Sequence, residues 1–153
     1  MTADTVIILD APLEARLVAA EMAIGPETGA SVTFSGRVRG EQERVRALYL
    51  ECYQSMARRA LHGMIRAARA RWQLHQVVIA HRIGEVAVGD LIVHVAVTAG
   101  HRREAFQACE YLMDYLKTAA PFWKKALADD GDHWVEARDR DQQAWRRWQE
   151  DEH

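Results

Sequence analysis

Hydrophobic residues recur with two different periods along this chain, and the order of these patterns limits the folds that the chain can adopt. Residues 54–72 and 101–119 carry apolar side chains at helical spacing. Residues 76–83 and 91–98, which lie between these two segments, are rich in β-branched residues and predict strands. Helices and strands are thus mixed without a strict strand-helix-strand alternation, which predicts an α+β fold.

Shorter segments complete the expected arrangement. In chain order, we expect a strand at 5–9, a helix at 12–23, strands at 30–39, 44–53, 122–128 and 133–137, and a helix at 139–148. The short link between 30–39 and 44–53 favours antiparallel pairing of these two strands. The segment IGEVAVGD predicts turns, because it holds two glycines and ends with an aspartate. Along 101–119, the side chains expected to face inward are those of Phe106, Cys109, Leu112, Met113 and Leu116.

Length and composition indicate one packed unit. A chain of 153 residues with 49% hydrophobic residues can bury a core, so we expect a single domain over 1–153 with a charged tail at about 149–153. The net charge of -2 argues against a general nucleic-acid binder. No apolar run is long enough to span a bilayer, and residues 1–10 lack the features of a signal peptide. We therefore expect a cytoplasmic protein that does not bind a membrane.

The cysteines and two of the histidines do not suggest a metal site. Cys52 and Cys109 are far apart and form no CxxC motif, so we favour buried thiols over a disulfide or a zinc site. His81 and His94 lie inside expected strands with no carboxylate or cysteine at ligand spacing. A structural role is the favoured interpretation for both, with metal binding as the alternative.

Basic residues gather where the helix expected at 101–119 begins. His101, Arg102 and Arg103 follow a strand and Gly100, at the helix end whose free N–H groups attract anions. The segment is either a phosphate site or an ordinary charged helix start.

Lys117 and Lys124 form a second candidate site near the other end of that helix. Lys117 could form a routine ion pair with Asp114, three residues earlier. The following KTAAPFWKK string would instead bring the two lysines close together beside aromatic rings, which lowers the pKa of an ammonium group. The polar face that Arg37 and Arg39 share, at the end of 30–39, is either solvated or the floor of a ligand site.

The sequence offers cations but no protein nucleophile. It contains no glycine-rich phosphate loop, no zinc motif, and no serine or cysteine with a suitably spaced base. If the chain is an enzyme, the attacking atom must therefore come from a substrate or from a partner.

Five strings occur together in one order and spacing: FSGRVR, HRIGEVAVGD, TAGHRREAF, YLMDYLKTAAPFWKK and DHWVEARDRDQQA. Through them the chain resembles the large, catalytic subunits of molybdopterin synthase, the MoaE family, from about residue 5 to 148. The resemblance implies an α/β-hammerhead with an additional antiparallel sheet. It also implies a sulfurtransferase of molybdenum cofactor biosynthesis that converts cyclic pyranopterin monophosphate to molybdopterin. The sulfur donor would be a small ubiquitin-like subunit with a C-terminal Gly-Gly thiocarboxylate, and no metal or cofactor would be needed.

The resemblance also implies roles for individual residues. Lys117 and Lys124 would be the catalytic lysines. The residues that would bind the substrate or shape its pocket are Arg39, His101, Arg102, Arg138 and Phe34.

Helix geometry adds an expectation about assembly. His101 and Lys117 lie at opposite ends of one expected helix, so their backbones are roughly 24 Å apart at 1.5 Å per residue. One small ligand cannot reach both within a single chain. If both serve one site, a second copy must supply His101 and Arg102, which predicts a homodimer at the core of a heterotetramer with two small subunits.

Two other classes of function remain open at this point. The chain could be a non-catalytic module that binds a ubiquitin-like protein, with lysines that only neutralise a carboxylate tail. It could also be a small RNA-binding domain that uses the basic outer face of the helix expected at 54–72.

Overall fold

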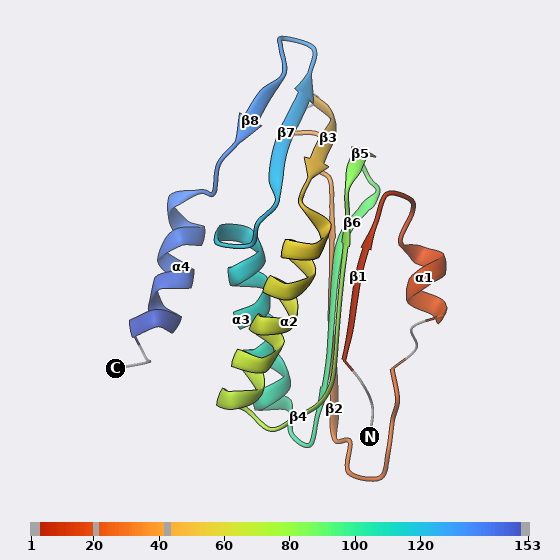
Figure 1. Ribbon diagram of the computed structural model, residues 1–153, viewed down its shortest axis with the longest axis vertical. Coiled ribbons are helices and arrows are strands. Elements are labelled where there is room, and N and C mark those ends of the chain that lie inside the picture. Colours follow the sequence, from red (N-terminus) through yellow and green to blue (C-terminus); the bar gives the residue numbers. More distant parts are fainter. Residues whose placement is uncertain (1–3, 20–21, 42–43, 151–153) are drawn as a thin grey trace.

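The computed structural model describes residues 4–19, 22–41 and 44–150. Its elements in chain order are β1 Thr5–Leu9, α1 Glu14–Ala19, β2 Ala30–Arg37, β3 Val45–Glu51, α2 Gln54–Arg71, β4 Leu74–Arg82, β5 Gly84–Ala87, β6 Leu91–Ala99, α3 Arg102–Thr118, β7 Trp123–Ala128, β8 His133–Val135 and α4 Asp139–Glu150. The mixture of helices with two separate sheets confirms the α+β class (Figure 1).

The first sheet has the strand order β1-β4-β6-β2, with β1 and β4 parallel and the other neighbours antiparallel. The long helices α2 and α3 lie on one side of this sheet and α1 on the other (Figure 1). Leu61 of α2 and Leu112 of α3 are fully buried in the main core, while Leu13 closes a smaller core on the α1 side. The apolar residues of β4 and β6 run almost without interruption because both faces of these central strands are covered.

The second sheet has the order β5-β3-β7-β8, and all its pairs are antiparallel. It lies beyond the C-terminal end of α3, at the top of Figure 1. The expected hairpin of β7 and β8 is confirmed. The segment 119–122 therefore carries the chain from the helix layer into the second sheet.

The predicted pairing of 30–39 with 44–53 is wrong. β2 pairs with β6 along its whole length, whereas β3 pairs with β5 and β7 in the other sheet. A short link permits a hairpin but does not require one. Val38 and Val45, on either side of the link, are both buried where the chain passes from the first sheet to the second, and this burial favours separate sheets over a hairpin. The link itself includes residues 42–43, which lie outside the described residues.

The segment IGEVAVGD, residues 83–90, was expected to form turns but contains the strand β5. β5 pairs with Ala47–Leu50 of β3, and Val86 is fully buried. Its four residues are too few for a recognisable period, so the partner strand rather than the local sequence determines this element.

Two predictions about helices also need correction. The helix expected at 12–23 is helical only at Glu14–Ala19, and residues 22–23 are not helical. The backbone N–H of Ala23 instead donates to Gln76 Oε1 at 2.8 Å. Phe106, expected to face inward, is 59% exposed, because Ala105 and Ala108 define the face of α3 that meets the sheet.

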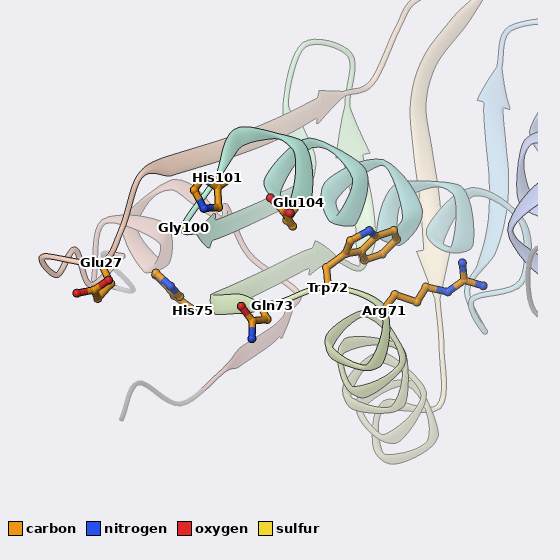
Figure 2. A pocket seen from close by; sticks show the side chains of 8 residues that line it. All are labelled: Glu27, Arg71, Trp72, Gln73, His75, Gly100, His101 and Glu104. Atoms are coloured by element: carbon orange, nitrogen blue, oxygen red, sulfur yellow. The ribbon is translucent and has the colours of Figure 1, made fainter.

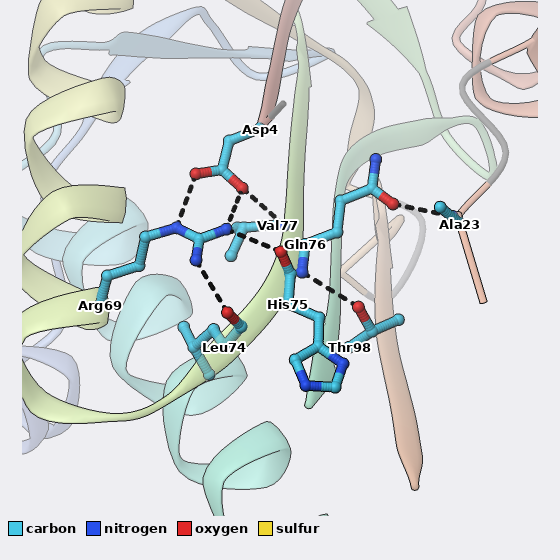
Figure 3. Close-up of polar contacts among 8 residues, drawn as sticks. All are labelled: Asp4, Ala23, Arg69, Leu74, His75, Gln76, Val77 and Thr98. Carbon is cyan, nitrogen blue, oxygen red and sulfur yellow. Dashed lines mark hydrogen bonds and ion pairs between the residues drawn. The ribbon is translucent and has the colours of Figure 1, made fainter. Parts of the chain in front are cut away.

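A polar cluster fastens α2 to the start of β4. Asp4 accepts two hydrogen bonds from Arg69, of 2.6 and 2.8 Å, and a third from the backbone N–H of Val77 at 3.0 Å (Figure 3). Arg69 also donates to the carbonyls of Leu74 and His75. The cluster holds the turn after α2 and aligns β1 with β4.

None of the helices in the described part of the chain is both long and apolar enough to cross a membrane. Of the expected charged tail, residues 149–150 belong to α4 and residues 151–153 lie outside the described residues.

Candidate active site

A cavity of about 700 Å³ lies where α3, the second sheet and the start of α4 meet. Its walls come from the end of β2 and the segment after it, the last turn of α3, β7, β8 and the first turn of α4. The charged residues that line it are Arg37, Arg39, Lys117, Lys124, Arg138, Arg140, Glu41, Glu136 and Asp141. Cationic side chains outnumber carboxylates in this lining, which favours an anionic ligand.

The two predicted catalytic lysines lie together in this cavity. Lys117 is in the last turn of α3 and Lys124 is the second residue of β7. The link between them is tight, since the N–H of Ala120 donates to the Tyr115 carbonyl and that of Phe122 to the Ala120 carbonyl. Proline and aromatic residues thus turn the chain sharply enough to place both lysines on one wall.

The environment of Lys124 favours its neutral form. Its cross-strand neighbours are Leu50 on β3 and Val135 on β8. The pKa of Lys124 is lowered from its ordinary value to about 8, mainly by burial and also by the charge of Lys117, while the charge of Asp141 raises it. The expectation of a lysine with a lowered pKa is confirmed for Lys124.

Lys125 lies on the other face of β7. Side chains alternate along a strand, and the Lys125 ammonium lies over the ring of Trp134, 5.7 Å from its centroid. It is not among the residues that line the cavity, although it is the immediate neighbour of Lys124.

Asp114, the alternative partner of Lys117, is occupied elsewhere. It accepts a hydrogen bond of 2.8 Å from the Trp148 indole and one of 3.4 Å from Arg147, both on α4. Asp114 therefore helps to fasten α4 against α3.

The predicted anion ligands Arg39 and Arg138 also line the cavity. Arg39 follows Val38, whose backbone N–H donates to the Asp90 carbonyl at 3.1 Å. Arg138 forms an ion pair of 3.3 Å with Glu41 across the cavity wall, and both side chains are about half exposed. An anionic substrate can compete with a pair this accessible, because water screens it.

The other predicted site residues lie apart from the lysines within one chain. His101 precedes α3 and lines a second cavity of about 510 Å³, together with Trp72, His75 and Glu104 (Figure 2). Arg102 and Phe34 line neither of these two cavities. The structure therefore separates His101 and Arg102 from the lysines by the length of α3.

His81 and His94 have structural partners. His81 is 4% exposed, donates from Nδ1 to the Arg82 carbonyl at 2.9 Å and stacks on Phe122. His94 Nδ1 shares a hydrogen bond of 3.0 Å with the Ser35 hydroxyl. No cluster of three or more His, Cys, Asp or Glu side chains suited to a metal ion occurs among the residues that the structure describes.

The sequence interpretation did not single out four charged residues that line the cavity. They are Glu41, Glu136, Arg140 and Asp141. Asp141 lies in the string DRDQQA, so the signal was present, but nothing in the string shows which of its charges faces inward.

Comparisons with known proteins agree on one family. The model of the family described as MoaE protein matches residues 8–119. A molybdopterin synthase catalytic subunit from Escherichia coli is 52% identical over 124 residues, covering 80% of this chain and 83% of that protein. The structure of a molybdopterin biosynthesis MoaE protein from Burkholderia ambifaria has a TM-score of 0.74 and 44% identity, over 97% of this chain and 98% of that chain.

A more distant structure shows the same fold. It comes from Helicobacter pylori, in a complex of subunits 1 and 2 of molybdopterin-converting factor, with a TM-score of 0.70 and 22% identity over 88% of this chain and 91% of that chain.

Proposed function

Because this chain belongs to the MoaE family, we propose that it is the catalytic subunit of a molybdopterin synthase that transfers sulfur to cyclic pyranopterin monophosphate. The observation that carries this proposal is the cavity that holds Lys117, Lys124, Arg39 and Arg138 together. None of its described lining residues is a serine or a cysteine. A cavity with cations and no thiol or serine nucleophile suits a reaction in which the sulfur arrives on another molecule.

The cations would act by charge stabilisation and proton transfer. Arg39 and Arg138 would bind the phosphate, and the thiocarboxylate would lie near the lysines. Its sulfur attacks a pterin carbon and displaces an oxygen of the cyclic phosphate, so that the carbon–sulfur bond forms as the carbon–oxygen bond breaks and the phosphate ring opens. The ammonium and guanidinium groups stabilise the negative charge that passes to the phosphate. Water then cleaves the bond between that sulfur and the carbonyl carbon of the tail, which leaves sulfur on the pterin and a carboxylate on the partner. A second thiocarboxylate would attack the neighbouring carbon, whose oxygen leaves as water after a lysine ammonium group donates a proton to it. Hydrolysis of that second tail would complete the dithiolene.

The state of Lys124 suits proton transfer in this scheme. With a pKa of about 8, Lys124 populates both its ammonium and its amine near neutral pH. Lys117, in the same wall, supplies a second positive charge. No metal or cofactor is part of the proposed reaction.

The sulfur donor would be a small ubiquitin-like subunit with a C-terminal Gly-Gly thiocarboxylate. An extended tail can enter beside β8, the edge strand of the second sheet, where His133 and Val135 line the cavity. Glycines suit a narrow entrance because they have no side chain to clash with its walls.

We further propose that two copies of this chain share each active site. His101 and Arg102 would be supplied by a second copy, because α3 keeps them far from the lysines of their own chain. β2 is an edge strand of the first sheet, and Phe34 and Phe106 are 40% and 59% exposed. Apolar side chains near an open edge are typical of a surface that another chain covers. With a small subunit at each site, the assembly would be a heterotetramer.

The proposed single domain would act in the cytoplasm, without nucleic acid or membrane as partner. Cys52 and Cys109 are both free thiols, as is usual in a reducing compartment.

The direct test is turnover. The purified chain is mixed with a small subunit that ends in a Gly-Gly thiocarboxylate and with cyclic pyranopterin monophosphate, and dithiolene formation is measured. A small subunit that ends in an ordinary carboxylate is the control. If the chain binds the small subunit but forms no product, it is a non-catalytic binding module instead.

A further inference from the structure

Asp141 is one of three carboxylates in the wall of the active-site cavity, with Glu41 and Glu136. It differs from the other two in its surroundings. Glu41 is about half exposed and paired with Arg138, and Glu136 is exposed. Asp141 is half-buried, so its charge is less screened by water than theirs.

The first turn of α4 fixes the position of Asp141. Its backbone N–H donates to the Arg138 carbonyl at 3.0 Å, which closes the turn that begins the helix. Asp139 lies in the same turn but is exposed and is not among the cavity-lining residues.

Lys124 lines the same cavity, and several of its neighbours disfavour its positive charge. Leu50 and Val135 flank it on the neighbouring strands. Lys117 on α3 and Arg138 before α4 add positive charge, and His81 on β4 is a neutral ring within electrostatic range. Asp141 is the carboxylate whose charge opposes these effects and raises the pKa of Lys124.

We propose that Asp141 is a positioning residue for the reaction. Its carboxylate is the counter-charge that keeps Lys124 in the cavity wall in its positively charged, ammonium form. The inference rests on the proposed function, in which Lys124 takes part in sulfur transfer. Without a counter-charge, burial and the positive neighbours would leave Lys124 as a neutral amine over more of the neutral pH range. A neutral amine cannot stabilise an anionic sulfur donor by charge.

The test compares Asp141→Asn with the matched variant Asp139→Asn. Both remove one negative charge from the first turn of α4, but only the first removes it from the cavity wall. The pKa of Lys124 is measured in each protein by NMR titration of isotope-labelled lysine side chains, without substrate. We expect a downward shift of the Lys124 pKa in D141N and none in D139N, while Asp141→Glu, which keeps the charge, titrates close to the wild type.

Rate–pH profiles give a second measurement. The part of the rate–pH profile in which the rate changes with the protonation of Lys124 should move to lower pH in D141N and stay in place in D139N. Circular dichroism checks that each variant is folded, and if D141N does not fold, Asp141→Ser replaces it.

An unchanged Lys124 titration in a folded Asp141 variant, or an equal shift in D139N, overturns the proposal. Because the titration needs no substrate, it is separate from the proposed function. A shifted Lys124 in a chain without sulfur transfer activity would reject the function and retain the role of Asp141 toward Lys124.

Discussion

The imidazole of His81 lies flat against the ring of Phe122, with the ring centroids 4.1 Å apart and the ring planes 12° apart. Phe122 is in the link between the two lysines and lines the cavity, whereas His81 is on β4 and is 4% exposed. The pKa of His81 is lowered to about 4, mainly by burial and to a smaller extent by the charges of Lys124 and Lys117, while the hydrogen bond to the Arg82 carbonyl acts in the opposite direction. Phe122, a lining residue of the cavity, thus stacks on a neutral imidazole.

The state of His81 predicts how stability depends on pH. The unfolded chain binds a proton at His81 near pH 6.5 but the folded chain only near 4, so the free energy of unfolding falls as the pH falls through this window. At 1.36 kcal/mol per pKa unit the loss is about 3 kcal/mol. Urea unfolding from pH 7 to pH 4 measures it. His81→Phe keeps the stacked ring and should lose this part of the slope; an equal slope in both proteins would contradict the assignment.

Lys117→Ala should reduce sulfur transfer by about 10²-fold or more, because it removes charge stabilisation and changes proton transfer at the cavity wall. Lys124→Ala should have a comparable effect. Lys125→Ala is the matched control, since Lys125 lies on the opposite face of β7 over Trp134 and should leave the rate near that of the wild type. Single-turnover rates and partner affinity are measured for each variant. Retention of more than about half the wild-type rate in Lys117→Ala would reject its catalytic role.

The partner's tail should be sensitive to bulk at its last glycine. Replacement of that glycine by phenylalanine should block sulfur transfer, because an aromatic ring must enter the cavity beside the lysines and compete for space with the pterin. Transfer is measured with both tails, and partner affinity is measured separately to detect loss of docking. Equal transfer rates with the two tails would exclude a narrow entrance.

Subunit complementation tests the shared active site. Mixed His101→Ala and Lys117→Ala chains should regain activity, since a heterodimer of the two contains one site with an intact His101 and intact lysines. Random exchange would restore about one quarter of the sites. A mixture of Lys117→Ala and Lys124→Ala is the control and should stay inactive, because both changes lie in the same cavity wall. An active monomer, or confirmed exchange without recovery, would contradict a shared site.

Local patterns in the sequence were enough to predict the elements whose apolar residues follow a long, regular pattern. α2 and α3 end within a residue or two of their expected bounds because long amphipathic periods are unambiguous. β4 and β6 were equally clear, since central strands covered on both faces need long apolar runs. The candidate lysines could also be named, because a proline and two aromatic residues between Lys117 and Lys124 imply a sharp turn.

The tertiary structure decided the strand pairing and the side-chain positions that depend on contacts between segments far apart in the sequence. The sequence could not show that β2 and β3 belong to different sheets, because strand pairing is set by which buried surfaces meet rather than by the length of the link. Nor could it show that β5 is a strand, since a four-residue segment takes its conformation from β3. Lys124 and Lys125 are neighbours with the same chemistry, and only the orientation of β7 in the sheet places the first in the cavity and the second over Trp134. The sequence determined which chemical groups are present, and packing between distant segments determined which of them share a site.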